Sequence, residues 1–188
     1  DRLKSFTQAF QTTSSGVGID FELLNHKLTG SIDVFNKSTE NAIFAKAAES
    51  TQIAPNALKY INLPGKILNK GIEVSLNYKI INTQDLTWDV SGNVSFLTNK
   101  MQDFPLFVPM GGVNGQGLTG ATAQVLADGY PVYSYYMYDF KGYDSTGNSI
   151  YTDAAGNNSP LASASPQILD KSALPKMNVG FNTSLSYK

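Results

Sequence analysis

The stretch Gly71-Ile-Glu-Val-Ser-Leu-Asn-Tyr-Lys-Ile80 decides the fold, because apolar and polar residues alternate along it without a break. After the short connection Ile81–Asp85, Leu86-Thr-Trp-Asp-Val-Ser-Gly-Asn-Val-Ser-Phe96 repeats the pattern, with Gly92 as its one gap. Strict alternation predicts a β-strand with one apolar and one polar face. Two such strands joined by a short turn predict a β-hairpin.

Strand length separates two interpretations of this hairpin. A soluble antiparallel sheet packs one face on a core, whereas an outer-membrane barrel turns its apolar face to lipid. Soluble strands are mostly ~5–6 residues long, and spanning strands need ~9–11. Tyr78 and Trp88 flank the turn and Phe96 lies at the far end, as interfacial aromatic residues do. These features favour the membrane barrel.

The rest of the chain supplies three more alternating strands. Val17–Leu23 and Leu28–Val34 flank Asn25-His26, a dipeptide suited to a tight turn because Asn tolerates positive φ. Met177–Tyr187 alternates at the end of the sequence. We expect Asp1–Ser15 to form a loop that leads into the first strand, with the end of an earlier strand as the alternative for part of it.

The connections alternate between very short and very long. Asn36–Lys70 contains Pro55 and Pro64 and an Ala-rich piece with helical potential, and Asn99–Lys171 is longer still. Short periplasmic turns and long extracellular loops are typical of outer-membrane barrels. The sequence therefore predicts an all-β fold: about five long antiparallel strands forming part of a large transmembrane β-barrel, with the short turns in the periplasm.

Composition excludes several classes of function. The 188 residues carry a net charge of −1 without a Lys/Arg cluster, which argues against a nucleic-acid partner. The sequence has no Cys and therefore no thiolate metal site or Cys nucleophile. No apolar run approaches the ~18 residues of a transmembrane helix. The sequence lacks a signal peptide and does not begin with Met, so we expect a piece of a longer precursor.

Three motifs with chemical potential lack a supporting context. Gly115–Gly120 matches the dinucleotide-binding pattern, but Pro105 and Pro109 make the preceding segment a poor central strand. Asp153–Asn158 resembles a calcium loop without its third-position ligand and its terminal Glu, and a Gly/Asn-rich turn is the simpler interpretation. His26 has no nucleophile motif near it. We predict no catalytic residue, no cofactor and no metal site, and hence no enzyme.

The run Tyr130–Phe140 is unusually rich in aromatic residues. Tyrosines in this region could stack on sugars or pack against a partner, and they could equally pack within the loop or join the aromatic girdle. Both interpretations stay open. The candidate contact residues for a substrate or partner are Tyr133, Tyr135, Tyr136, Tyr138 and Tyr143.

Five motifs, taken together and in order, resemble the SusC/RagA family of TonB-linked outer-membrane transporters of Bacteroidetes. They are the hairpin formed by Gly18–Phe21 and Leu28–Thr39, then Asn69–Leu76, then Leu86–Trp88 with Asn99-Lys100, then Gly129–Tyr136, and the closing strand with Ala173–Lys176, Gly180-Phe181 and Leu185–Lys188. The matches run across essentially the whole chain. There are two departures: Tyr133 stands where the family usually has Gly, and the family's acidic loop is degraded at Asp153–Asn158.

The resemblance implies a function for the chain. Residues 1–188 would be a segment of the β-barrel domain, without the plug domain, the TonB box and the carboxy-terminal strand. The complete transporter would import oligosaccharides or peptides across the bacterial outer membrane, driven by TonB through the plug and covered by a SusD-like lipoprotein lid. The alternative from another class is a soluble or cell-surface β-sandwich that binds glycans or acts as an adhesin. The direction of the alternating apolar residues separates the two.

Overall fold

The computed structural model describes residues 9–47, 58–113, 115 and 121–188. The chain divides into two compact units, which we call unit 1 (residues 1–99 and 175–188) and unit 2 (residues 100–174). Both are built from β-strands, and the only helix in the described ranges is a 3-10 turn at Leu161–Ser163. No helix of the described residues has the length and apolar character needed to cross a membrane.

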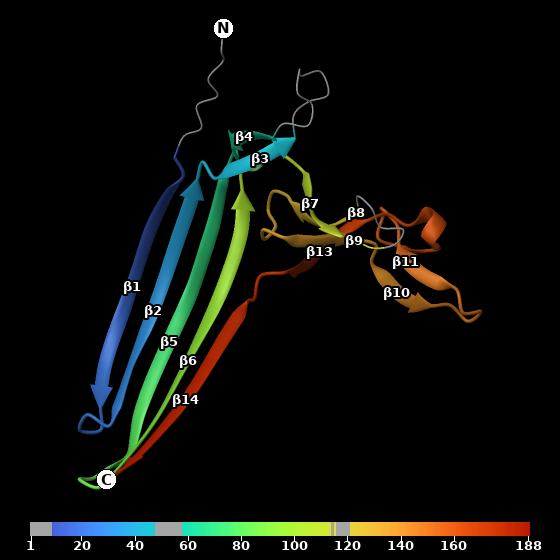
Figure 1. Ribbon diagram of the computed structural model, residues 1–188. Helices are drawn as coiled ribbons and strands as arrows, with labels where there is room; N and C mark the ends of the chain where they lie inside the picture. The colour runs from blue at the N-terminus through green and yellow to red at the C-terminus, as the bar shows by residue number, and fades with distance from the viewer. Residues whose placement is uncertain (1–8, 48–57, 114, 116–120) are drawn as a thin grey trace. The chain divides into compact units, whose positions relative to one another are not determined.

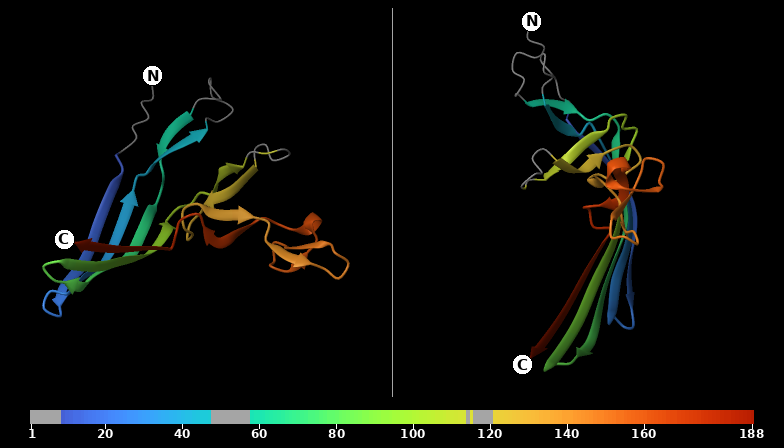
Figure 2. Two further views of the ribbon diagram at one scale, coloured as in Figure 1. Left: turned by 60° about the horizontal axis from the view of Figure 1, so that its bottom comes forward. Right: turned by 90° about the vertical axis from the view of Figure 1, so that its right-hand side faces the viewer.

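Unit 1 is dominated by one sheet of five antiparallel strands in the order β1-β2-β5-β6-β14 (Figure 1). Two further views show that the sheet is bowed along its length (Figure 2). Its strands are β1 (Gln11–Leu23), β2 (Leu28–Glu40), β5 (Lys66–Asn82), β6 (Leu86–Gln102) and β14 (Met177–Tyr187).

Two short turns join the strands at one end of this sheet. Leu24, Asn25 and His26 all have positive φ, at 56°, 52° and 64°, and the turn between β1 and β2 extends over Leu24–Lys27, beyond the dipeptide alone. Between β5 and β6, the Thr83 hydroxyl donates to the Leu86 carbonyl and accepts from the Leu86 amide, at 2.9 and 3.0 Å. Both turns are thus fixed by local interactions.

The strand register stacks apolar side chains in rows across β1, β2 and β5. Because directly paired residues of neighbouring strands point to the same face, each row crosses all three strands. Four consecutive rows on one face are apolar or Gly, and we call this side of the sheet the apolar face. The rows are Leu23–Leu28–Tyr78, Phe21–Gly30–Leu76, Ile19–Ile32–Val74 and Val17–Val34–Ile72.

The remaining two strands continue the same division. The Asn99 side-chain amide donates to the side-chain oxygen of Asn69 at 2.6 Å, which places the odd-numbered residues of β5 and β6 on the polar face. Even-numbered residues of β6 therefore extend the apolar face, together with their partners in β14. On β14 these positions span ten residue steps, or ~34 Å along the strand. At a barrel tilt of ~40° this length corresponds to a height of ~26 Å, close to the ~25 Å apolar band of an outer-membrane barrel.

No second sheet covers the apolar face of unit 1. Val17, Val179 and Phe181 are 70%, 66% and 76% exposed, and none of the residues 9–47, 58–99 and 175–188 that belong to these strands is buried. A soluble sandwich would enclose such residues in a core. Six apolar residues of the alternating segments are exposed or half-buried, which fits a lipid-facing sheet: Ile72, Val74, Leu76, Val90, Val94 and Val179.

The strands are longer than the alternation of apolar residues predicts. The expected loop Asp1–Ser15 is wrong from Gln11 onward, because β1 begins there and pairs with Glu40. The long connections are likewise shorter than expected, since β5 starts at Lys66 and β6 ends at Gln102. The added segments do not alternate, since apolar residues such as Ile67 and Leu68 are adjacent in β5, so alternation could not reveal them.

The first long connection contains a β-hairpin where a helix was considered. β3 (Ile43–Ala47) pairs with β4 (Leu58–Asn62), and the Asn62 side chain donates to the Asn41 carbonyl at 2.7 Å. The helical interpretation of the Ala-rich piece is wrong for residues up to Ala47, and the rest of that piece lies outside the described residues.

Unit 2 contains two small sheets and the main core of the described chain. A four-stranded sheet has the order β13-β9-β8-β7, and a three-stranded meander has the order β10-β11-β12. Met101, Phe104 and Val125 are almost fully buried. The strands are β7 (Val108–Val113), β8 (Ala121–Leu126), β9 (Ser134–Met137), β10 (Phe140–Tyr143), β11 (Ser149–Thr152), β12 (Asn158–Ser159) and β13 (Gln167–Ser172).

Candidate functional site

Four aromatic side chains of unit 2 form a group, which we call the aromatic cluster, with Tyr151 half-buried and the other three exposed: Tyr138, Phe140, Tyr143 and Tyr151. The Phe140 ring lies 5.3 Å from that of Tyr143 and 5.7 Å from that of Tyr151, both edge to face. The Tyr138 and Tyr151 rings are 6.2 Å apart in the same geometry. Edge-to-face pairs at these distances are mutually stabilising.

The meander places these residues side by side. Phe140 pairs with Tyr151 across β10 and β11, and an irregularity in the register follows before Gly142 pairs with Ile150. Tyr143 is 69% exposed, Phe140 49% and Tyr138 46%, although each ring has an aromatic neighbour. Large rings held rigidly at the surface suit contact with a ligand or a protein, because little conformational entropy is lost on binding.

Two similar turns hold the meander in place. The Asp144 carboxylate accepts hydrogen bonds from the Thr146 hydroxyl and from the Thr146 and Asn148 amides, at 2.7 to 2.9 Å. These bonds, that of the Thr146 hydroxyl first, lower the pKa of Asp144 to about 2. Nine residues later, the Asp153 carboxylate accepts from the Ala155 and Asn157 amides in the same way, and its pKa is also lowered.

The second of these turns is the segment that resembles a calcium loop. Its carboxylate is occupied by backbone amides, as in an ordinary Asx turn. Within the described residues, no group of three or more His, Cys, Asp or Glu side chains is arranged to hold a metal ion. The geometry therefore supports the turn interpretation of Asp153–Asn158.

An ion pair lies directly beside the cluster. The Lys141 ammonium is 2.6 Å from the Asp139 carboxylate, and this contact is the main cause of the lowered pKa of Asp139. The Thr152 hydroxyl, which is buried, donates weakly to the same carboxylate at 3.3 Å. A charged pair next to aromatic rings gives the surface both polar and apolar character.

The meander also borders an open cavity of about 660 Å³. Tyr151 forms part of its wall, and Asn148 and Asn158 contribute amide groups. The Ser159 hydroxyl lines the same cavity and is buried without a hydrogen-bond partner among the described residues. An aromatic wall with several amide and hydroxyl groups is suited to polyhydroxylated or peptide ligands.

The other predicted tyrosines lie apart from the aromatic cluster. Tyr135 and Tyr136 are neighbours in β9, so their side chains point to opposite faces of the four-stranded sheet. The Tyr136 ring packs against that of Phe107 at 5.0 Å. Both tyrosines are half-buried, which supports packing within unit 2 more than ligand contact.

Tyr133 has an unusual backbone. Its φ is 59°, in the left-handed region that non-glycine residues rarely adopt. Ser134 next to it is fully buried and donates to the Pro131 carbonyl at 2.7 Å, and the Ala173 amide bonds to the Tyr133 carbonyl. This geometry explains why the related pattern usually has Gly at this position. The Tyr133 side chain is 42% exposed.

The structure thus unites Tyr138 and Tyr143 and adds two residues that were not among the candidates. Phe140 and Tyr151 join the cluster because β10 pairs with β11. The sequence alone does not reveal the register of this pairing. The exposure of Phe140 and its contact with Tyr151 were not visible in the sequence. The Asp-x-x-Gly-Asn pattern, which occurs in both turns, was the sequence signal for a meander whose strands these turns join.

Comparison with known proteins places the chain in a family. Residues 9–187 match the family model described as "TonB dependent receptor-like, beta-barrel". The chain belongs to this family. The match spans both units, so the sheet of unit 1 is a portion of a TonB-dependent receptor barrel and the fold prediction is confirmed, with a partial barrel in this chain.

Two curated TonB-dependent receptors resemble the chain over nearly its full length. The chain is 29% identical to TonB-dependent receptor P3 of Formosa agariphila, over 92% of its own length and 18% of that protein. It is 30% identical to TonB-dependent receptor SusC of Bacteroides thetaiotaomicron, over 100% of its own length and 19% of SusC. The chain therefore spans about a fifth of these receptors.

Solved structures give the same result for the fold. The RagAB peptide transporter superimposes with a TM-score of 0.71 at 22% identity, covering 95% of this chain and 20% of that one. The RagAB peptide importer in its open-open state gives the same TM-score at 20% identity, over 94% of this chain and 19% of that one. The resemblance to the SusC/RagA family that the sequence motifs indicate is confirmed.

Proposed function

We propose that residues 1–188 form a segment of the barrel domain of a TonB-dependent importer of oligosaccharides or peptides in the bacterial outer membrane. The observation that carries this proposal is the sheet of unit 1, whose apolar face has only exposed or half-buried residues over four complete rows and whose other face is mainly polar. A lipid-facing apolar side and a lumen-facing polar side account for both. TonB would act through a plug region outside these residues.

We place the short turns in the periplasm and unit 2 on the extracellular side. Unit 2 is inserted between the ends of β6 and β14 that are remote from the short turns. Long insertions on the extracellular side are typical of these barrels, and loops on a rigid scaffold commonly carry recognition. The family name of the SusC relative supports a SusD-like lipoprotein partner for the same side.

The aromatic cluster is the proposed contact surface for the substrate or the lid lipoprotein. Three of its four rings are exposed yet held by neighbouring rings, and an ion pair and a polar cavity lie next to it. Tyr133 contributes a further exposed aromatic ring in unit 2, whereas Tyr135 and Tyr136 are assigned to packing. Nothing in this arrangement requires a catalytic step.

The test removes the exposed rings and measures transport. In the full-length protein, we expect the double variant Tyr138→Ala/Tyr143→Ala to lower uptake or lipoprotein co-purification at least fivefold, at unchanged barrel yield. Tyr60→Ala is the matched control, because Tyr60 is an exposed tyrosine of unit 1 in the β3–β4 hairpin. Wild-type values for both readouts in the double variant would exclude the cluster as a contact surface.

A further inference from the structure

We propose that Lys70, together with Ser15 and Asn36 in the same row of the sheet, binds the phosphate group of an anionic lipid in the outer leaflet of the membrane. The proposal rests on the membrane placement given above. It adds a lipid-binding site at the border of the apolar face, where the protein surface changes abruptly in character.

The border follows directly from the strand register. Val17–Val34–Ile72 is the last of the four apolar rows, and Ser15–Asn36–Lys70 is the row that follows it. Two residue steps, or ~7 Å along the strands, separate the two rows. All three residues of the polar row are exposed, and they lie on the same face as the apolar rows. An ammonium, an amide and a hydroxyl therefore stand at headgroup height.

Lys70 carries an uncompensated charge at this border. Two rows further up, the Lys66 ammonium lies 3.0 Å from the Glu40 carboxylate, so that carboxylate is already engaged. Among the described residues Lys70 itself makes no ion pair or side-chain hydrogen bond. A lysine at this depth extends its ammonium toward the interface while its methylene groups stay against apolar surface.

The chemistry of the row selects a phosphate over other groups. The ammonium supplies positive charge, and the neighbouring hydroxyl and side-chain amide supply further hydrogen-bond donors. A phosphate ester carries charged oxygens that accept from all three. The lipid tails below the phosphate would lie on the apolar rows, which makes the occupant a phospholipid or phosphorylated glycolipid and not a free anion.

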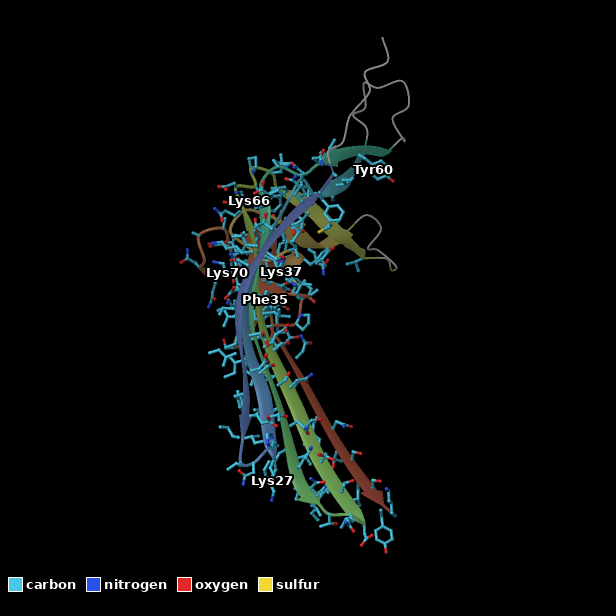
Figure 3. All side chains as sticks on the ribbon, turned by 90° about the vertical axis from the view of Figure 1, so that its left-hand side faces the viewer. Lys27, Phe35, Lys37, Tyr60, Lys66 and Lys70 are labelled. Atoms are coloured by element: carbon cyan, nitrogen blue, oxygen red, sulfur yellow. The ribbon has the colours of Figure 1, made fainter. Side chains whose placement is uncertain are left out.

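The opposite face provides a matched control. Lys37 is one residue further along β2 and pairs with Asn69, the neighbour of Lys70, so Lys37 and Lys70 share a height on opposite faces of the sheet (Figure 3). The Lys37 ammonium lies 5.0 Å from the centre of the Phe35 ring on the polar face. In a barrel this face points to the lumen, where lipid cannot reach.

The experiment compares lipid binding by variants of the full-length protein. Detergent-purified protein is titrated with diphosphorylated lipid A, and bound lipid is counted by native mass spectrometry. We expect Lys70→Gln to weaken binding about fivefold, Lys70→Arg to retain it and Lys37→Gln to leave it unchanged. Lipid A stripped of its phosphates should bind all four proteins equally weakly.

Three results would overturn the inference. They are unchanged binding in Lys70→Gln, an equal loss in Lys37→Gln, and displacement of the lipid by equimolar inorganic phosphate. Heat-modifiable migration in gels reports separately on barrel insertion. If the protein inserts and one of these results is found, the lipid site alone is disproved. If the protein never inserts, the proposed function is disproved as well.

Discussion

The smallest residues of the five-stranded sheet lie beneath some of its largest side chains. A Cβ added to Gly30 would lie 2.6 Å from the Phe21 ring and 2.6 Å from the Ser75 carbonyl oxygen. On the polar face, a Cβ added to Gly71 would lie 2.6 Å from the Phe35 ring. Aromatic rings thus cover the exposed backbone at glycines, a device that fixes strand register.

Replacing Gly30 by Ala should therefore destabilise the sheet. The contact with the Ser75 carbonyl cannot be relieved by a side-chain rotation, so the expected loss in unfolding free energy is about 1–3 kcal/mol. The control is Gly92→Ala on β6, where the added Cβ would meet its nearest atom, the Gly180 carbonyl oxygen, at 3.5 Å. Denaturant unfolding of the barrel in detergent measures both, and equal midpoints would contradict the packing described here.

A charge on the apolar face should have a larger effect than the same charge on the polar face. Val74 lies in the third apolar row, well inside the band, and Val74→Arg should cost ~2–4 kcal/mol and impair membrane insertion. Asn77 lies on the opposite face of the same strand, and Asn77→Arg should fold normally. Heat-modifiable gel migration compares them, and similar yields of folded barrel would argue against the assignment of faces.

At the scale of elements, the paired Asp turns are the features that shape unit 2. Each turn uses one carboxylate to bind backbone amides two and four residues ahead. Each also has a Gly with positive φ, Gly147 at 86° and Gly156 at 85°. The two turns set the lengths of β10, β11 and β12 and thereby bring the aromatic cluster together.

The turn at Asp144 should loosen in acid. Because its pKa falls from 3.8 to about 2 on folding, its contribution to stability is complete above pH ~4 and is lost as the pH falls through about 2. Hydrogen exchange of the peptide covering Thr146 and Asn148, corrected for intrinsic rates, should show protection disappearing in this range. Asp144→Asn should remove the pH dependence, and an unchanged profile in that variant would show that another group is responsible.

The sequence predicts some elements of this chain and is silent on others for a physical reason. Alternation identified the membrane part of every long strand, since lipid on one side imposes a period of two on residues such as Ile72 and Val74. Above the membrane both faces meet water, so nothing in the sequence marks that β2 continues to Glu40. Of the aromatic cluster, the sequence indicated Tyr138 and Tyr143 but not Phe140 and Tyr151, because the pairing of Phe140 with Tyr151 depends on a turn and a register shift.

At the scale of the whole molecule, the open edges of the sheet are decisive. β1 and β14 are the outer strands and pair on one side only, over 13 and 11 residues. Unpaired backbone groups in hydrocarbon cost several kcal/mol each, so both edges must pair with further strands in the membrane. This requirement agrees with a chain that covers 20% of the RagAB transporter chain.

The isolated segment should consequently fail to insert. When residues 1–188 are refolded alone into phosphatidylcholine vesicles, we expect no protease-protected, heat-modifiable species, whereas the full-length protein should give one under the same conditions. A protected monomeric segment would show that the edges are satisfied without neighbouring strands. A protected oligomer would show instead that copies of the segment can replace them.

The upper parts of β5 and β6 have a consequence for how the receptor can vary. β5 continues from Lys70 to Lys66 beyond the apolar rows, ~14 Å of hydrogen-bonded strand and ~10 Å of height at a barrel tilt of ~40°. This part of the sheet, which we call the collar, separates the apolar rows from the ends of the strands at which the loops are inserted. Insertions and substitutions in the loops therefore act above the collar and leave the lipid boundary undisturbed, so a single barrel can acquire new ligand specificities without having to refold its membrane part.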